Sequence, residues 1–559
     1  MKTTTLLSSL LIVSNPYSSA AEKKEQKPNI IFILTDDHNY ELLGCNGNTI
    51  IQTPQFDKLA KEGVCFTNAH VSSAISTPSR ACIFTGQYER KHGVNFNSGT
   101  SLSDEAWNES YPLELRNNGY YTGFIGKNHV PIGDGGYQSG LIEKSFDYWY
   151  GAMGHLGFYP KERANIFNGA KHDTQVEVLT EGILDFLDNN EYRLIGAEHF
   201  LNSRPKDKPF CLSICFNLPH DASTGTMKQL ATDSIIYRSL YRDVNIKMPA
   251  NYIAKKDIKT PKLPLSIHHV SDRQDGYNYV DEPATNKERI IRHMQAVTGI
   301  DGLLGKLREQ LKAAKLDKNT IIIFTSDHGL FFGQQGLGGK ATCYEQNTHV
   351  PMIIYNPMAP KSARGRINDE LVQTIDIAPT MLTYAGVDIP KGMQGKDISG
   401  IIDGTKKEVR QYLYTENLWS THFGNPRCES VQDKEWKYIR YYKNQNPSAV
   451  EEVKNAKILG LKVNEIMYSV HDPAIVLYRS FIEGPVNNEE PVYEELYHLT
   501  VDPQELHNVI SDNNNKPILG TLKNQWSILI KEARGTEKPK VLRYTADYMQ
   551  ERYGAIKNE

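Results

Sequence analysis

Runs of apolar residues alternate along this chain with amphipathic stretches of helical period. The run at 29–35 is continuous and rich in β-branched residues, as expected of a strand buried on both faces. Four similar runs follow, at 121–125, 209–216, 320–325 and 350–355. The intervening patterns predict helices at 173–187, 287–314 and 374–385. A further helix is predicted from Pro54 to Ala60, with Thr53 as its cap and Gly63 as its stop.

Strands that alternate with helices predict an α/β layer fold with a large, mostly parallel sheet flanked by helices. The pattern changes after about residue 417, where short aromatic segments of alternating polarity appear at 436–442 and 494–499. These segments predict a small antiparallel sheet, followed by a late helix at 519–533. We therefore expect a catalytic domain at 25–417 and a small α+β C-terminal subdomain at 418–559.

The first residues have the pattern of a signal peptide. Lys2 precedes an apolar run at 6–13, and small residues follow up to Ala20 and Ala21. The alternative is a membrane anchor, but the run is too short to span a bilayer. We expect cleavage of residues 1–20 and a periplasmic or secreted protein. No later segment is long and apolar enough to predict a membrane span.

Composition narrows the classes of partner. The chain has 559 residues and a formal net charge of -3, which gives no general reason to expect nucleic acid. Seven cysteines are an odd number for an exported chain. Cys211 and Cys215 would lie about 13 Å apart on one strand, too far to form a disulfide. Most of the cysteines are interpreted as buried thiols, and one disulfide elsewhere stays open.

Two predicted strands end in acidic residues, Asp36-Asp37 after the first and Asp327-His328 after the fourth. The carboxyl ends of parallel strands meet at one edge of a sheet, so these side chains should lie together. Their carboxylate oxygens are hard ligands that suit Ca²⁺, with Mg²⁺ less favoured. A solvated turn is the alternative for one aspartate pair at a strand end.

The segment from Ser76 to Gly86 reads STPSRACIFTG. It predicts a loop that enters a short helix, with Ser76 at the helix N-terminus, where free amides and the helix dipole favour an anion. Arg80 lies one turn further on and could reach back to the same place. A serine cap beside a surface arginine is the alternative for a lone motif of this kind.

This segment resembles the signature of the type I sulfatases, Cys/Ser-x-Pro-Ser-Arg followed by Thr-Gly. Ser76 makes the chain similar to the serine-type subgroup, which implies oxidation of Ser76 to formylglycine (3-oxoalanine) by a serine-type radical-SAM maturase. The resemblance continues in order along the chain, at 28–37, 53–60, 119–129, 219–220, 325–329, 340–351 and 494–505.

The resemblance implies an alkaline-phosphatase-like sulfatase fold and a bacterial carbohydrate sulfatase. Its substrate would be a sulfated saccharide, of glycosaminoglycan or mucin type. The implied metal ligands are Asp36, Asp37, Ser76, Asp327 and His328, with one Ca²⁺ as the expected ion. The implied sulfate-binding residues are Lys127 and Lys340, and the implied catalytic residues are Ser76, Arg80, His129 and His220.

In the implied reaction, a hydroxyl of the Ser76-derived hydrate attacks sulfur and forms a covalent sulfo-enzyme intermediate. His220, assisted by Lys340, would protonate the leaving alcohol, and His129 would then accept the proton whose loss releases sulfate. Three positions depart from the commonest family pattern: Asn128 replaces a frequent Trp, His349 replaces a frequent Arg, and Asp221 replaces a frequent Pro.

Two alternatives stay open. A phosphatase or phosphodiesterase of the same superfamily would use unmodified Ser76 and would need more metal ligands, yet the sequence suggests no further His/Asp set. An inactive glycan-binding protein would have lost a site residue, yet all expected positions are filled. Substrate specificity should reside in four loops, at 94–105, 129–159, 221–279 and 444–490.

Overall fold

A computed structural model describes residues 27–95, 100–133, 135–181, 183–187, 191–223, 225–264, 267, 277–418, 426–443, 478–537 and 542–543. The predicted signal peptide at 1–20 and the larger part of the loop at 444–490 lie outside these residues. None of the described helices is long and apolar enough to cross a membrane.

A mixed sheet of eight strands forms the centre of the described structure, in the order β14-β2-β13-β10-β1-β9-β5-β6. Its bounds are β1 Asn29–Asp36, β2 Val64–Phe66, β5 Tyr121–Asn128, β6 Tyr148–Met153, β9 Phe210–Pro219, β10 Thr320–Ser326, β13 Met352–Tyr355 and β14 Arg366–Asn368. Strands β10, β1, β9, β5 and β6 run parallel to one another, which confirms the predicted parallel core.

Strand β13 runs antiparallel to both of its neighbours, β10 and β2. The reason lies in the connection that precedes it. The chain leaves β10 at its carboxyl edge and passes through the short helix α12 (Glu345–Thr348) without a long crossover helix. It therefore enters β13 from the same edge and must run back in the opposite direction.

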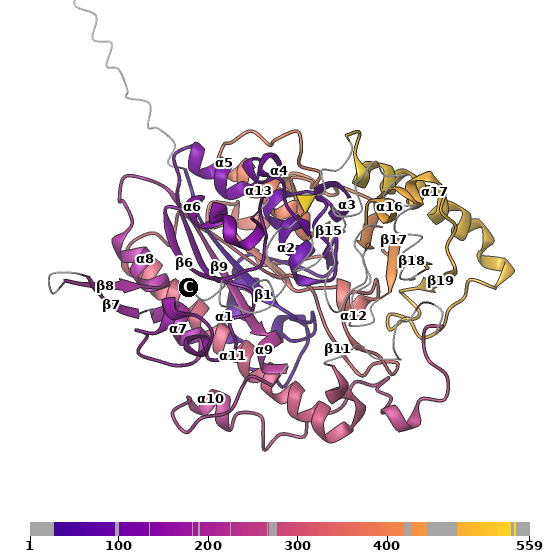
Figure 1. Cartoon of the computed structure of the whole chain (residues 1–559), viewed down its shortest axis with the longest axis horizontal. Coiled ribbons are helices and arrows are strands. Elements are labelled where there is room, and N and C mark those ends of the chain that lie inside the picture. The colour runs from indigo at the N-terminus through magenta and orange to yellow at the C-terminus, as the bar shows by residue number, and fades with distance from the viewer. Residues whose placement is uncertain are drawn as a thin grey trace, which may run out of the picture.

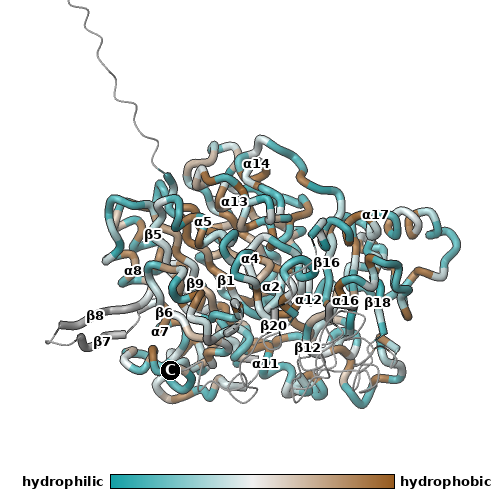
Figure 2. The backbone as a smooth tube through the Cα atoms, turned by 45° about the horizontal axis from the view of Figure 1, so that its top comes forward, coloured by the Kyte–Doolittle hydropathy of each residue, from teal (hydrophilic) through white to brown (hydrophobic). Residues whose placement is uncertain are grey.

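Helices cover both faces of this sheet (Figure 1). Alternate side chains of β1 divide between two cores, Ile31 and Ile33 on one face and Ile30, Phe32 and Leu34 on the other. The first core includes helices α1 Pro54–Glu62, α7 Gln175–Glu181, α8 Ala197–Ser203 and α11 Pro283–Ala313. The second includes α2 Ser76–Thr85, α5 Tyr111–Asn117 and α13 Ile377–Tyr384. The apolar segments accordingly gather in the interior (Figure 2).

The predicted helix at 173–187 is wrong in its second half. Helix α7 ends at Glu181, and Ile183–Leu187 forms strand β7, which pairs antiparallel with β8 (Glu191–Ile195). A short apolar run fits either a helix or a strand by its periodicity alone. The backbone hydrogen bonds of the hairpin decide in favour of the strand.

Helix α1 begins after Thr53, as predicted, but the Thr53 side chain makes no capping hydrogen bond. Asp301 of α11 takes that role, because its carboxylate accepts hydrogen bonds from the amides of Gln55 (2.9 Å) and Phe56 (2.8 Å). The first-turn amides of α1 are therefore satisfied by a residue far away in the sequence.

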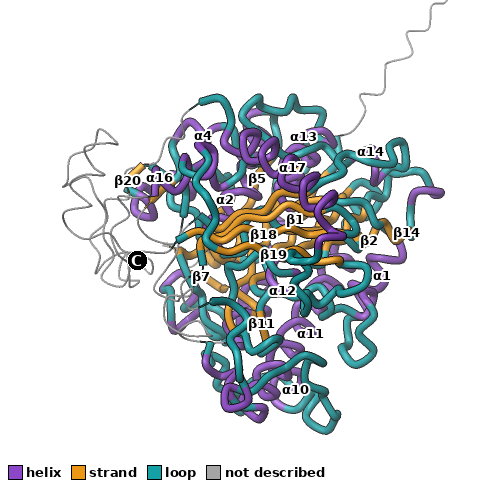
Figure 3. Tube along the Cα trace, turned by 90° about the vertical axis from the view of Figure 1, so that its right-hand side faces the viewer, coloured by secondary structure: helices purple, strands orange, loops and turns teal. Residues whose placement is uncertain are grey.

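The C-terminal part contains the predicted antiparallel sheet, made of β16 Leu413–Asn417, β17 Arg427–Gln432, β18 Trp436–Tyr442 and β19 Tyr493–His498 (Figure 3). Helix α17 (Lys516–Arg534) packs Leu522, Trp526 and Ile530 against one face of it. The other face meets Phe331, Cys343 and Tyr344 of the larger part. This second contact brings the small sheet close to the loop that precedes α12.

The remaining short elements are α3 Glu89–His92, α4 Asp104–Asn108, α6 Leu141–Lys144, α9 His220–Ser223, α10 Ile235–Arg238, α14 Ser399–Ile402, α16 Tyr478–Glu483, β3 Ala69–His70, β4 Thr100–Ser101, β11 Phe331–Phe332, β12 Gly338–Gly339, β15 Val372–Gln373 and β20 Leu542–Arg543. All seven cysteines have free thiols.

Candidate active site

The carboxyl ends of the central strands meet at one edge of the sheet, as the sequence predicts. Asp36 ends β1, and Asp327 follows β10, its parallel neighbour. Lys127 lies near the end of β5, and His220 directly follows β9. All of the predicted site residues are buried. They are Asp36, Asp37, Ser76, Arg80, Lys127, His129, His220, Asp327, His328 and Lys340.

Ser76 is the first residue of α2, so its hydroxyl lies at the helix N-terminus. The hydroxyl donates to Asp36 Oδ1 over 3.3 Å and lies 3.0 Å from His328 Nε2. His328 Nδ1 in turn lies 3.1 Å from Asp37 Oδ1, and the Asp37 amide donates to Asp327 Oδ1 over 3.4 Å. The five predicted metal-site residues thus form one continuous cluster around Ser76.

Arg80 reaches the cluster from one turn further along α2. Its Nε donates to Asp327 Oδ2 over 2.9 Å, and its Nη2 donates to Asp36 Oδ2 over 3.2 Å. The same Nη2 donates to the carbonyl of Phe216 over 3.0 Å, at the end of β9. The guanidinium therefore joins three neighbouring strands at the site, and the surface arginine considered from the sequence is excluded.

Two lysines complete the group of cations. The Lys127 ammonium pairs with Asp36 Oδ2, and Lys340 Nζ lies 3.0 Å from Asp37 Oδ1. Burial raises the pKa of Asp36, but Lys127, His220 and Arg80 outweigh it and hold that pKa well below its usual value. For Asp37, too, neighbouring cations outweigh burial and lower the pKa. Both carboxylates are therefore ionised at neutral pH.

The donor set fits a divalent metal ion. Three buried carboxylates meet within a few ångströms, and the groups Asp36/Asp327/His328 and Asp36/Asp37/His220 each have ligand atoms within 4.8 Å of one another. Asp37 Oδ2 is buried and accepts no hydrogen bond from the described residues. Carboxylate oxygens of this kind are the ligands that hard divalent cations prefer.

The backbone of Asp37 has a positive φ of 62°, which is uncommon for a residue other than glycine. His293 of α11 stabilises this position, because its Nε2 donates to the Asp37 carbonyl over 2.7 Å. Strained backbone is found at functional sites where the surrounding structure holds it in place. Here it turns the second aspartate back toward the cluster.

Three histidine rings line the same edge. His155 stacks on His220 with ring centroids 4.7 Å apart and meets His129 edge-on at 5.2 Å. His220 Nε2 lies 3.8 Å from Asp37 Oδ2, and its Nδ1 lies 3.6 Å from Asp221 Oδ1. Burial and the nearby Lys127 hold the pKa of His155 well below its usual value, so this ring is neutral.

The sequence predicted the loop that contains His155 but did not single out His155 as a site residue. It lies two residues after β6, which is a parallel strand at the end of the sheet, within a loop predicted to control specificity. The strand β6 was not predicted, so the rule that places chemistry at strand ends could not be applied to it.

Two further groups of histidine and carboxylate side chains come together in the structure. His155, His220 and Asp221 form a third group with ligand atoms within 4.8 Å of one another, and His70, Glu345 and His349 form a fourth. In each group one histidine, His155 or His70, lies far from the other two residues in the sequence, so the sequence did not indicate either group. The fourth group lies outside the active site described above.

Comparison with known proteins now decides the family. A family model described as "Sulfatase" matches residues 28–387, which include every predicted site residue. The chain belongs to the sulfatase family. A second model, described as "N-sulphoglucosamine sulphohydrolase, C-terminal", matches residues 333–456. The predicted enzyme class, a sulfuric ester hydrolase, is thereby confirmed.

Among curated sulfatases, an N-acetylglucosamine-6-O-sulfatase of Bacteroides thetaiotaomicron is 28% identical over 490 residues, covering 78% of this chain and 83% of the relative. A protein whose structure was solved in complex with its substrate D-glucosamine-2-N,6-O-disulfate has a TM-score of 0.63 at 21% identity, covering 91% of this chain and 98% of the other.

A phosphonate monoester hydrolase of Agrobacterium radiobacter also has a TM-score of 0.63, at 17% identity, covering 90% of this chain and 96% of the other. At such identities a structural likeness shows the fold alone. The predicted alkaline-phosphatase-like sulfatase fold is confirmed by these matches together with the family model.

Proposed function

We propose that this sulfatase removes O-sulfate groups from sulfated carbohydrates, with a nucleophile formed by oxidation of Ser76 to formylglycine. One observation carries the proposal. The Ser76 hydroxyl lies at the N-terminus of α2, 3.3 Å from Asp36 and 3.0 Å from His328, beside a cluster that contains Arg80, Lys127 and Lys340. Such a site offers a nucleophile and cations to one bound anion.

The charges of the site fit a sulfate ester. Asp36, Asp37 and Asp327 contribute three negative charges, which Arg80, Lys127 and Lys340 balance. We infer that Asp36, Asp37, Asp327, His328 and the residue at position 76 hold one divalent cation, with Ca²⁺ favoured by the oxygen-rich ligand set. When bound, the ion polarises the sulfate oxygens as a Lewis acid. Lys127 and Lys340 would then contact the substrate's sulfate oxygens.

A formylglycine hydrate at position 76 supplies one hydroxyl that attacks sulfur and a second whose deprotonation releases sulfate. Arg80 holds this residue indirectly, by fixing Asp36 and Asp327 at the ends of two neighbouring strands. His220 donates a proton to the carbohydrate oxygen as the S–O bond breaks, assisted by Lys340. His129 accepts the proton of the second hydroxyl. The ring of His155, packed against both histidines, orients them.

The names of two related sulfatases indicate the class of substrate. The N-acetylglucosamine-6-O-sulfatase noted above and an ulvan-active sulfatase of Formosa agariphila, 27% identical over 498 residues, both act on carbohydrates by name. We infer a sulfated saccharide of glycosaminoglycan or mucin type as the substrate. The signal peptide predicted at 1–20 favours export to the periplasm or beyond. A serine-type radical-SAM maturase is the partner that this chemistry requires.

Two measurements test the proposal. The first is mass spectrometry of the peptide that contains Ser76, from protein co-expressed with a serine-type maturase. We expect the loss of one H₂ at Ser76, and a Ser76→Ala variant as control shows no such species. The second is sulfate release from a panel of sulfated mono- and disaccharides, beside matched phosphate esters. Full turnover by protein with unmodified Ser76, or turnover of phosphate but not sulfate esters, would overturn the proposal.

A further inference from the structure

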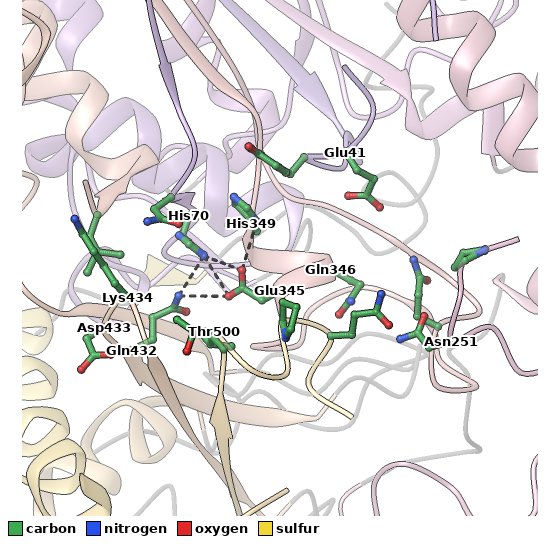
Figure 4. A pocket seen from close by; sticks show the side chains of 18 of the residues that line it. Glu41, His70, Asn251, Glu345, Gln346, His349, Gln432, Asp433, Lys434 and Thr500 are labelled. Atoms are coloured by element: carbon green, nitrogen blue, oxygen red, sulfur yellow. Dashed lines mark hydrogen bonds and ion pairs between the residues drawn. The ribbon is translucent and has the colours of Figure 1, made fainter. Parts of the chain in front are cut away.

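The fourth histidine–carboxylate group lies in a separate cavity of about 490 Å³ (Figure 4). None of the proposed catalytic residues lines this cavity. His70 ends β3, Glu345 begins α12, and His349 caps the C-terminus of α12. Gln432 of β17 and Lys437 of β18 approach from the C-terminal sheet. The cluster therefore lies where the two parts of the molecule meet.

Glu345 is at its centre, and each of its two oxygens has several partners, of which His70 Nε2 contacts both. Oε1 accepts a hydrogen bond from Lys437 over 2.6 Å and another from the Gln432 amide over 3.3 Å. Oε2 lies 3.2 Å from His70 Nε2 and 3.4 Å from His349 Nδ1. Lys437 and Gln432 thus orient the carboxylate, and the second oxygen faces two imidazole nitrogens.

The hydrogen bonds fix which ring atoms carry protons. His349 Nε2 lies 2.8 Å from the Thr67 carbonyl, which can only accept, so Nε2 carries the proton and Nδ1 of the neutral ring carries a lone pair. A lone pair of nitrogen therefore faces a carboxylate oxygen.

His70 Nε2 lies 3.2 Å from both oxygens of Glu345 and 3.2 Å from the amide nitrogen of Gln432. Two imidazole groups and one carboxylate therefore gather here, with ligand atoms that lie within 4.8 Å of one another. Imidazole and carboxylate groups are ligands that zinc and similar divalent ions take in proteins.

The distances fit a small divalent ion. Zinc binds nitrogen and carboxylate oxygen at about 2.0–2.2 Å, and tetrahedral ligands at that radius lie about 3.3–3.5 Å apart. The N–O separations here are 3.2 and 3.4 Å. We propose that His70, Glu345 and His349 bind a zinc-like divalent cation, at a site distinct from the catalytic centre.

The ligand types of the proposed zinc site and of the catalytic site favour different metal ions. Two imidazoles and one carboxylate favour Zn²⁺ or Co²⁺ over Ca²⁺, whereas the carboxylate-rich catalytic cluster favours Ca²⁺. Glu345 and His349 are 16% and 19% exposed at their side chains, so an ion can enter from the cavity. The ion would tie β3 and α12 together beside the C-terminal sheet, next to the loop that carries Lys340. Its expected role is structural.

The test uses untagged full-length protein that has been stripped with EDTA and then saturated with Ca²⁺. We expect one equivalent of Zn²⁺ to bind in competition with a chromogenic chelator, and Co²⁺ to give the ligand-field absorption of a nitrogen-containing site. His349→Arg places a cation beside Glu345 but cannot ligate a metal, and His70→Gln removes another ligand. Each variant should lower the Zn²⁺ affinity at least about tenfold.

Three controls make the result specific. His507→Gln alters an exposed histidine 3.6 Å from Asp502 and should bind Zn²⁺ like the wild type. Ser76→Ala should also bind normally, which separates this site from the proposed catalytic function. His155→Gln tests the histidine group beside the active site. The proposal is wrong if the wild type binds no Zn²⁺, if His349→Arg and His70→Gln bind it unchanged, or if His155→Gln alone abolishes binding.

Discussion

Replacement of Arg80 by lysine separates the charge of this residue from its geometry. The guanidinium spans three acceptors, at 2.9 Å from Asp327, 3.2 Å from Asp36 and 3.0 Å from the Phe216 carbonyl. A single ammonium group can replace only one of these contacts, because it is compact and has no planar fork. One carboxylate and one buried carbonyl would then lose the hydrogen bond that residue 80 donates.

The magnitude follows from those two losses. A hydrogen bond between charged partners contributes about 1.5–3 kcal/mol, and an unsatisfied buried acceptor costs about 1–3 kcal/mol. The free energy of unfolding in EDTA should therefore fall by about 2.5–6 kcal/mol, the sum of these two losses. The decrease in the free energy of unfolding should be smaller in saturating Ca²⁺, because a bound cation compensates the charge of the carboxylate that has lost its hydrogen bond.

Urea unfolding, followed by tryptophan fluorescence, measures the difference. Arg242→Lys is a matched control, since Arg242 pairs in bidentate fashion with Glu288 but both side chains are about one-third exposed. Exposed pairs of this kind contribute at most about 1 kcal/mol. The reasoning is refuted if Arg80→Lys changes the free energy of unfolding by less than about 1 kcal/mol, or by no more than Arg242→Lys.

Four further outcomes are expected. Lys127→Met should reduce kcat/KM for sulfate release by about 10²–10³, because it removes a buried cation from the site, and an unchanged kcat/KM would contradict its proposed role. Removal of metal by EDTA should abolish sulfate release, and Ca²⁺ should restore it in the wild type but not in Asp36→Asn, as a continuous sulfate assay would detect. Burial raises the pKa of Asp301 to about 6, so the folded state binds more protons than the unfolded state between about pH 4 and 6. The free energy of unfolding of the wild type should therefore fall as the pH rises through that window. Urea midpoints measured across the same pH range should not show this fall for Asp301→Asn. Thiol titration of unfolded, non-reduced protein should give seven thiols. A count of five would mean that one pair, either Cys343 and Cys428 or Cys45 and Cys65, had formed a disulfide.

Local patterns in the sequence were sufficient to predict much of the fold and the meeting of Asp36, Asp37 and Asp327 at one edge of the sheet, whereas Lys127, His129, His220 and Lys340 were predicted from the family resemblance. The apolar run at 29–35 is buried on both faces, and this alone predicts a central strand whose end carries Asp36 and Asp37. The segment that begins at Ser76 is specific because its chemistry depends on a helix N-terminus, which is a local structure. A buried strand and a helix N-terminus each depend on residues that are close together in the chain, so the sequence alone determines them.

Tertiary structure decided whatever depends on distant neighbours. The hairpin at Ile183–Leu187 replaced a predicted helix because β8 supplies its backbone partners, and Asp301 rather than Thr53 caps α1. His155 and the cluster of His70, Glu345 and His349 come together only when separate segments fold onto one edge or one interface. Sequence spacing does not encode such distances, because the packing of helices and sheets sets them.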